Sequence, residues 1–328
     1  MLKLLKKTAL LSFILIVGVG YGFLISRYHL FPYGLIQKVY YNFSGKSKGP
    51  WSIGIYTGDS PFVLESSDSI QNPIITVDDI DDVDGVFVAD PFLLVKDSIF
   101  YIYFEVLNRE TMQGDIAYAF SQDLKKWQYG QVVLDEEFHL SYPNIFQWKG
   151  EIYMVPESNE AHSVRLYKAT GFPDKFEYVE NLLEGYQYDD PNVFYYNKKW
   201  WMFVSKPEHD VMHLYYSSEL MGEWKLHPQS PIRQFDKKYS GTSGRIFTSN
   251  GKLYRLAQDC EEYYGKQVYC FEIDSLTTEH YHEKLVGTDP LFKKGRSNWN
   301  NKGVHHADIQ NIDNRWFAII DGQKKNNN

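Results

Sequence analysis

The sequence predicts an all-β fold, a five-bladed β-propeller preceded by a single N-terminal transmembrane helix. Two observations lead to this prediction: a repeated strand–turn–strand pattern and an uncharged N-terminal run. Each of five stretches reads as an apolar strand, a polar turn and a second strand rich in aromatic residues. A repeat of about 50 residues with several strands per unit is typical of propeller blades. Successive stretches begin 52, 48, 53 and 62 residues apart, at Asp90, Tyr142, Asp190, Ser243 and His305.

The uncharged run extends over 17 residues, from Ala9 to Ile25, and follows Lys3, Lys6 and Lys7. A helix of that length is about 25 Å long, at the short end of what crosses a bilayer. More positive charge precedes the run than follows it, which predicts cytoplasmic lysines and an extracytoplasmic propeller. A cleavable signal peptide is the alternative. The predicted segments are a cytoplasmic tail (1–8), a transmembrane anchor (9–25), a stem (26–50), the propeller (51–323) and a tail (324–328).

Composition supports a globular domain and excludes one class of partner. The chain of 328 residues is 43% hydrophobic and 17% aromatic, which is enough for a sizeable core. Its net charge is −8, and no basic stripe with interleaved aromatic residues appears, so nucleic acid is not an expected partner. Most aromatic rings are expected to pack inside the sheets, and some to stack on sugar rings.

The two cysteines, Cys260 and Cys270, lie on either side of a Tyr-Tyr-Gly-Lys stretch that reads as a hairpin tip. Opposed residues of a hairpin reach disulfide distance, so the pair is a disulfide candidate in an oxidising compartment. Two free thiols are the alternative.

The repeats also predict where polar side chains gather. Residues equidistant from the turn of a two-stranded hairpin face each other. This count places Asp90 opposite Glu105 and Tyr142 opposite Glu157. If the first strand of each blade is innermost, all five repeats converge on one mouth. The same count gives three further pairs, namely Asp190 with Ser205, Ser243 with Gln258, and His305 with Ile320, with Asp321 one residue further on.

Carboxylates at strand ends are the candidate catalytic groups. Such residues are depleted in strands, yet here they begin or end strands with apolar interiors. Carboxylates that share a concave site raise one another's pKa, which suits a general acid and a general base for glycosidic bonds. The alternatives are turn capping by an Asp that precedes a proline, and rim salt bridges of the Glu residues with Arg165 or Arg245. The residues concerned are Asp90, Glu105, Glu157, Asp190 and Asp259.

No metal site is predicted. His305 and His306 precede Asp308, but adjacent strand residues point to opposite faces and do not readily share an ion. The acidic stretch 77–85 lacks EF-hand spacing and reads as a solvated loop. No cofactor is expected, and a central calcium stays open.

Several motifs together resemble one family. They are WSIGIYTGDSPF at 51–62, NPIIT at 72–76, FVADPFLLV at 87–95, HLSYPNIF at 139–146, MVPES at 154–158, LYRLAQDCEEYYG at 253–265, and GVHHADI with AIIDG near the C-terminus. In this order they resemble the N-terminal propeller domain of the glucosamine inositolphosphorylceramide transferase family and its bacterial relatives. The resemblance covers roughly residues 50–323. The implied fold is similar to the five-bladed propellers of glycoside hydrolase families 43 and 32.

The resemblance implies roles for two aspartates. Asp90 matches the family 43 general base, and Asp190 matches the aspartate that tunes and orients the acid. The fourth-blade position of the hydrolase acid reads Ser-Gly-Arg here, with Ser243 and Arg245 and no Glu. Glu157 or Glu105 is therefore the candidate acid. Plant family members carry a separate glycosyltransferase domain after the propeller, which this sequence is expected to lack.

The expected function is that of a membrane-anchored, extracytoplasmic, carbohydrate-active protein. Its expected partners are a glycan, glycolipid or other sugar-containing substrate, the membrane, and a glycosyltransferase. One alternative is a non-catalytic glycan-binding module that serves a glycosyltransferase, and another is a protein-interaction scaffold. The predicted substrate-binding residues are Tyr142, Ser243, Arg245, Gln258, Asp259, His305 and Asp321.

Overall fold

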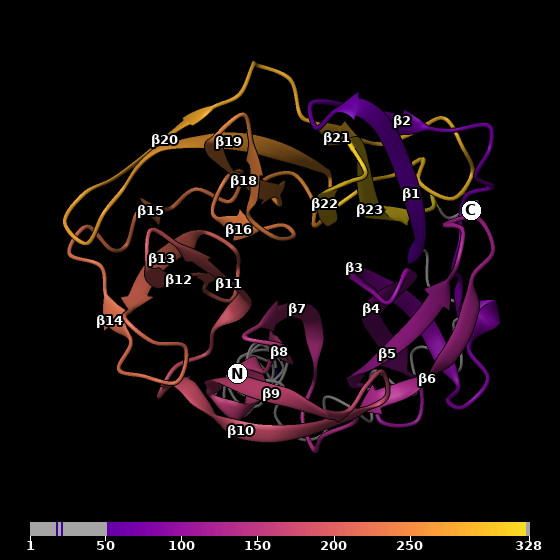
Figure 1. Ribbon diagram of the computed structural model, residues 1–328, viewed down its shortest axis with the longest axis horizontal. Helices are drawn as coiled ribbons and strands as arrows, with labels where there is room; N and C mark the ends of the chain where they lie inside the picture. Colours follow the sequence, from indigo (N-terminus) through magenta and orange to yellow (C-terminus); the bar gives the residue numbers. More distant parts are fainter. Residues whose placement is uncertain (1–17, 19–20, 22–50, 326–328) are drawn as a thin grey trace, which may run out of the picture. The chain divides into compact units, whose positions relative to one another are not determined.

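The computed structural model describes Gly18, Tyr21 and residues 51–325 of the chain. Its strands form five sheets arranged as blades around a central axis (Figure 1). This confirms the predicted five-bladed β-propeller. The predicted anchor and stem lie outside the described residues. Within the part of the chain that is described, no helix is long and apolar enough to cross a membrane.

The first two blades each contain four antiparallel strands, numbered from the axis outward (Figure 1). A short 3-10 helix, η1 (Val77–Asp79), precedes blade I, and η2 (Asn159–Ala161) lies within blade II. Blade I consists of β3 (Gly85–Lys96), β4 (Ile99–Asn108), β5 (Gly114–Ser121) and β6 (Gln128–Leu134). Blade II consists of β7 (Ser141–Trp148), β8 (Glu151–Glu157), β9 (Ser163–Gly171) and β10 (Lys175–Glu184).

The next two blades have interrupted inner or outer strands. Blade III consists of β11 (Asp189–Tyr196), β12 (Lys199–Ser205), β13 (Val211–Ser217), and the short outer strands β14 (Lys225–Leu226) and β15 (Arg233–Gln234). Blade IV consists of the inner pieces β16 (Gly241–Thr242) and β17 (Phe247–Ser249), then β18 (Lys252–Asp259), β19 (Gln267–Leu276), β20 (Tyr281–Leu285) and β21 (Phe292–Lys293).

Blade V closes the ring with strands from both ends of the described chain. Its inner strands are β22 (Ala307–Ile312) and β23 (Arg315–Gln323), and its outer strands are β1 (Trp51–Ser60) and β2 (Val63–Ser66). In Figure 1 the yellow pair β22 and β23 lies beside indigo β1 and β2. Strands β1 and β23 pair from Trp51 with Gln323 to Gly58 with Trp316. The repeat pattern did not predict this closure, because β1 and β2 carry no copy of the template.

Tight turns fix the register of every inner hairpin. Both central residues of each turn have positive φ, the backbone of the type I′ turn that matches the twist of paired strands. Only the Asn-Gly turn was predicted as this type. The Asp, Asn and Gly residues of the other turns tolerate the left-handed region for the same reason. The turns are Asp97-Ser98, Lys149-Gly150, Asn197-Lys198, Asn250-Gly251 and Asp313-Asn314.

The predicted register is wrong at the mouth end of blade I. Phe92 faces Tyr103 as the count requires, but Ala89, and not Asp90, faces Glu105. The reason is a β-bulge at Asp90, whose φ of 53° lies in the left-handed region. A bulge adds one residue to a strand and re-aims its side chain. Asp90 is therefore turned out of the ladder.

The same bulge occurs in blades II and III. In blades IV and V the observed register differs from the predicted one by more. Ser141 faces Glu157 in place of Tyr142, and Asp189 faces Ser205 in place of Asp190. Tyr142 and Asp190 have φ of 46° and 50°, and each precedes a proline, as Asp90 does. In blades IV and V the pairs are Gly241 with Gln258 and Ala307 with Ile320, so the predicted partners Ser243 and His305 lie outside the ladder.

Apolar and charged contacts hold neighbouring blades together. Between blades I and II, Phe92, Tyr103 and Met154 belong to one buried cluster. Between blades III and IV, buried Arg255 and Arg233 both lie 2.7 Å from Glu283 Oε1. The two arginines lower the pKa of Glu283 to about 2, against the opposing effect of burial. Removing one side chain of this cluster would leave an uncompensated charge. The cluster therefore keeps blades III and IV packed against each other.

Gly244 links blades IV and V and provides a stability test. Its φ is +80°, and a Cβ there would overlap the backbone carbonyl of Ala307. Gly251 has a similar φ of +75° with open space around it. We expect Gly251→Ala to cost about 1–2 kcal/mol, the left-handed penalty alone. Gly244→Ala should cost about 3 kcal/mol or more, since a clash adds to that penalty. Chemical denaturation of both variants measures the difference, and equal losses would contradict the close contact.

Candidate functional site

The mouth of the propeller gathers polar side chains from all five blades. The inner-strand starts and the loops that follow each second strand lie at this end. Asp90, Glu105, Glu157 and Asp190 are all buried there, and they influence one another electrostatically. The predicted carboxylates therefore share one site.

A charged histidine lies between two carboxylates at the centre of this site. His305 Nε2 is 3.1 Å from Asp90 Oδ1, and His305 Nδ1 is 2.7 Å from Asp321 Oδ2. All three side chains are buried. Asp321 Oδ1 also accepts the backbone N–H groups of His305 and His306, each at 3.0 Å. Asp321 thereby joins the fifth blade to the backbone N–H of Asp90, which lies 3.3 Å from Oδ2.

This arrangement keeps Asp90 ionised. Burial alone raises the pKa of Asp90, but the charge and hydrogen bond of His305 outweigh it, and the pKa lies below its ordinary value. Burial lowers the pKa of His305, but Asp321 and Asp90 together raise it well above its ordinary value. His306 is different: burial lowers its pKa, and its Nε2 lies 3.0 Å from the Pro91 carbonyl. One imidazolium therefore serves two carboxylates.

In three other carboxyl groups of the site the pKa is shifted in the opposite direction, upward. Burial is the largest cause that raises the pKa of Glu105, Glu157 and Asp190 well above their ordinary values. Negative neighbours add to it: Asp90 for Glu105, Asp189 for Glu157, and Glu157 for Asp190. The pKa of Asp90 is therefore lowered, whereas the pKa values of Glu105, Glu157 and Asp190 are raised within the same site.

Hydrogen bonds orient Asp190 and Glu157. The Asp190 backbone N–H donates to Glu157 Oε2 at 2.9 Å, and Gln258 Nε2 donates to Asp190 Oδ2 at 2.9 Å. His209 Nδ1 lies 3.7 Å from the same Asp190 oxygen. Glu105 Oε1 lies 3.4 Å from His139 Nε2. The alternative prediction, in which the Glu residues form rim salt bridges with Arg165 or Arg245, does not match these contacts.

Several of the predicted substrate-binding residues make structural contacts. Tyr142 Oη donates to the Gly244 carbonyl at 3.0 Å, and Ser243 Oγ donates to the His305 carbonyl at 2.8 Å. Arg245 binds Asp308 through Nε at 2.5 Å and Nη2 at 3.0 Å, and Nη2 also donates to the Leu93 carbonyl. Its guanidinium is thereby used to join three blades. Asp259 accepts from Gln267 Nε2 at 2.8 Å, within its own hairpin.

Sequence reasoning missed an aromatic wall beside the central histidine. The ring of Trp51 lies 4.5 Å from that of His305, and the ring of Tyr264 lies 5.1 Å from it. Tyr264 also lies 5.6 Å from His209, and 48% of it is exposed. His209 and Tyr264 occupy the loops after the second strands of blades III and IV. The sequence signal that could have identified these two residues was the position of their loops, directly after the second strand of each repeat.

The donors at the centre do not fit calcium. Asp90, His305 and Asp321 each offer one ligand atom, and these lie within 4.8 Å of one another. Calcium prefers six to eight oxygen ligands. Here an imidazole separates the two carboxylates, and each of its nitrogens faces one of them.

The predicted disulfide does not form. Cys260 and Cys270 are both free thiols. The register of β18 and β19 explains this, because Cys270 faces Leu256 while Cys260 lies beyond the last pair, Asp259 with Gln267. Cys270 packs in an apolar cluster, and burial raises its pKa to about 12.

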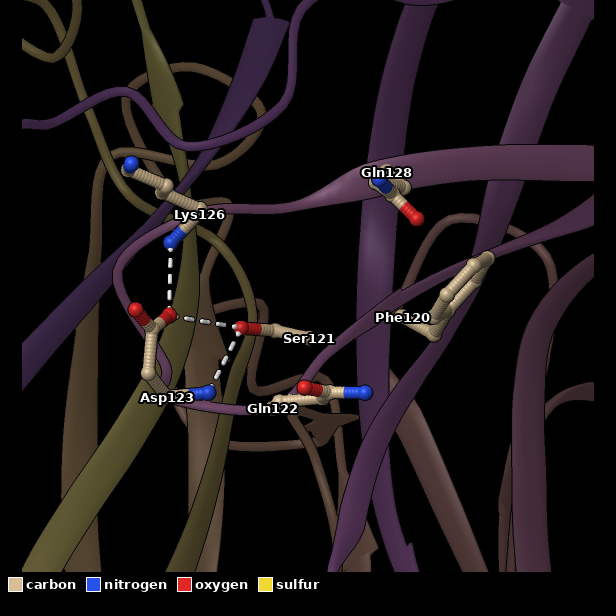
Figure 2. A pocket seen from close by; sticks show the side chains of 6 residues that line it. All are labelled: Phe120, Ser121, Gln122, Asp123, Lys126 and Gln128. Atoms are coloured by element: carbon tan, nitrogen blue, oxygen red, sulfur yellow. Dashed lines mark hydrogen bonds between the residues drawn. The ribbon is translucent and has the colours of Figure 1, made fainter.

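A hollow of about 250 Å³ lies at the other end of blade I, at the turn between β5 and β6 (Figure 2). Asp123 Oδ1 accepts hydrogen bonds there from Ser121 Oγ at 3.2 Å and Lys126 N at 2.9 Å. Blade III repeats the turn, with Glu219 N donating to Ser217 Oγ at 3.3 Å. The polar atoms that line the hollow form hydrogen bonds within the turn itself. The hollow therefore follows from the structure of the blade. It is lined by Phe120, Ser121, Gln122, Asp123, Lys126 and Gln128.

Comparison with known proteins identifies the family. The family model described as "Glucosamine inositolphosphorylceramide transferase 1, N-terminal" matches residues 44–323. The chain belongs to this family. Glucosamine inositolphosphorylceramide transferase 1 of Oryza sativa subsp. japonica is 36% identical over 302 residues, covering 84% of this chain and 40% of the relative. The Arabidopsis thaliana protein of that name is 33% identical, covering 85% and 39%. The chain thus spans about two-fifths of these relatives.

Solved structures share the fold of this family member. A putative glycoside hydrolase from Parabacteroides distasonis aligns with a TM-score of 0.60 and 12% identity, covering 83% of this chain and 100% of that one. A thermostable family 43 glycoside hydrolase aligns with a TM-score of 0.55 and 14% identity, covering 77% and 91%. At these identities the likeness concerns the fold alone.

The raised pKa of Glu157 predicts an unusual pH dependence. Its folded pKa exceeds the ordinary value of 4.5, so the native state binds more protons than the unfolded state above that pH. Stability is therefore lost as pH rises through the folded pKa. Glu157→Gln removes this loss, so the variant should be more stable than wild type at about pH 8 and equal to it below pH 4.5. Denaturation at both pH values measures it, and an equal loss of stability at both would refute the buried neutral acid.

Proposed function

We propose that the mouth binds a sugar of a glycan or glycolipid and acts on its glycosidic bond. The observation that carries the proposal is the pair of opposed protonation states. Against the effect of burial, His305 lowers the pKa of Asp90, while burial raises the pKa values of Glu105, Glu157 and Asp190 well above their ordinary values. Groups whose surroundings push their pKa values apart are typical acid and base partners.

In this proposal Asp90 is the base, and Glu157 or Glu105 is the acid. Asp190 orients the acid, since its backbone N–H donates to Glu157 Oε2. Trp51 and Tyr264 supply ring faces beside the centre, and sugar rings pack well on such faces. Gln258 and His209 provide polar groups that can receive sugar hydroxyls. The curated relatives are named for glucosamine and inositolphosphorylceramide, which supports a glycolipid substrate.

The proposal includes an extracytoplasmic, membrane-anchored propeller. Lysines before an uncharged run of 17 residues support an N-terminus in the cytoplasm. A glycolipid substrate is itself held in a bilayer, which agrees with a tethered site.

Replacing the base tests catalysis. Asp90→Asn should lower turnover about 10²–10⁴-fold, because the amide cannot accept a proton. The substrates are glycolipids with one terminal sugar, amino sugars included, and the matching free oligosaccharides, with products followed by mass spectrometry. Asp123→Asn, in the outer turn of blade I, is the matched control and should keep wild-type turnover. Full turnover by Asp90→Asn would refute the catalytic assignment.

A second candidate is a glycan-binding module that serves a glycosyltransferase. The fourth blade favours it, because Ser243 stands where the related hydrolases carry their acid and its hydroxyl is bonded to the His305 carbonyl. Under this alternative the wild-type protein binds the same glycans without turnover on long incubation, and Trp51→Ala weakens binding. A protein-interaction scaffold would bind none of them.

A further inference from the structure

A group of cations lies where the chain enters the propeller, and one of them, Lys302, has its Nζ 5.8 Å from the centre of the Tyr263 ring. Although the net charge of the protein is −8, none of these side chains forms a salt bridge with a residue that the structure describes. Neighbouring Lys266, by contrast, is paired with Glu262 at 2.6 Å. We call the group the basic corner, and all its members are exposed: Lys293, Lys294, Arg296, Lys302, Lys324 and Lys325.

Backbone contacts bring the basic corner together around Trp51, the first strand residue. Trp51 pairs with Gln323, and the Gln323 carbonyl accepts the Lys302 N–H at 2.9 Å. Lys325 N donates to Asn301 Oδ1 at 2.6 Å. Lys293 pairs with Gln267, next to the hairpin tip that carries Tyr264. These cations therefore come from the loop before blade V and from the end of β23.

The basic corner also borders the mouth. The ring of Trp51 lies 4.5 Å from that of His305, and a Cβ on Gly265 would touch both residues. Tyr263 Oη donates to the Lys302 carbonyl at 2.8 Å. Anything that binds the basic corner therefore lies beside the opening of the site and beside the chain that leads to the N-terminal run.

We propose that the basic corner binds the surface of an anionic phospholipid bilayer, with the mouth opening beside the membrane. Clustered exposed lysines next to a membrane segment are attracted to anionic lipids. The uncharged run ends 25 residues before Trp51, a tether that permits several orientations. The positive charge of the basic corner selects the orientation in which this corner faces the bilayer. Access of the mouth to a glycolipid rests on the proposed function, whereas the lipid contact does not.

Lipid proximity is measured on the full chain reconstituted in vesicles. An environment-sensitive fluorophore is attached at Ser297→Cys, within the basic corner, in a Cys260→Ser background. Ser218→Cys, an exposed serine in the turn between β13 and β14 at the opposite end, is the matched control. The vesicles are phosphatidylcholine alone or with about 30% phosphatidylglycerol, and both contain a spin-labelled lipid that quenches nearby fluorophores.

Quenching at position 297 should exceed that at 218, rise with phosphatidylglycerol and fall at high salt. Each cation strengthens such binding about fivefold, so Lys302→Gln/Lys324→Gln/Lys325→Gln, which replaces three of the six cations, should weaken the phosphatidylglycerol-dependent part about 10²-fold. Lys125→Gln/Lys198→Gln/Lys225→Gln, at the opposite end, should leave it intact. Equal quenching at 297 and 218, or no response to phosphatidylglycerol, overturns the proposal and favours an acidic protein partner. No turnover is measured, so this outcome is independent of the catalytic test.

Discussion

The buried contact between Asp321, His305 and Asp90 determines the electrostatics of the mouth. Three ionisable groups removed from water are costly unless they are paired and hydrogen-bonded. Here each nitrogen of the imidazolium faces a carboxylate, and Asp321 also accepts two backbone N–H groups. The same contact joins blade V to blade I, where the ring closes. Site charge and ring closure thus depend on one set of side chains.

The remaining carboxyl groups follow from that arrangement. His305 lies between two carboxylates, and Arg245, the nearest candidate among the described residues of the blade starts, is instead bound to Asp308. Burial raises the pKa values of Glu105, Glu157 and Asp190, because a neutral carboxyl group costs less to bury than a carboxylate. The opposite pKa shifts of Asp90 and its carboxyl neighbours thus depend on where a single histidine lies.

The sequence predicted the fold and the grouping of the acids, because strand periodicity and turn residues are local signals. It did not predict the exact register. In blade I the count from the turn is correct as far as Phe92, and the bulge at Asp90 then shifts it by one residue. In blade V the turn itself lies one residue later than predicted, at Asp313-Asn314. A bulge depends on φ at one position, which periodicity does not reveal. The motif Asp-Pro was visible, but its left-handed backbone was not.

Contacts between distant segments explain the other differences. Arg245 was a substrate-binding candidate because it stands at a blade start, yet its partner Asp308 lies 63 residues away. Trp51 was overlooked because β1 follows no repeat, and it reaches His305 only once blade V is complete. The two cysteines are not opposed for a local reason that spacing alone could not decide, since the hairpin is centred on Tyr263, two residues before the midpoint between them.

Ring closure through β1 also determines at which end of the propeller the N-terminal strand begins. The N-terminal strand of the propeller is also the strand that starts beside the mouth, because Trp51 pairs with the end of β23. A chain tethered through its N-terminus is therefore held at the end that carries the site. The carboxyl groups at the centre are buried, and the exposed cations of the basic corner lie beside them. The two proposals therefore assign attachment to an anionic surface and binding of a sugar to the same face of the propeller.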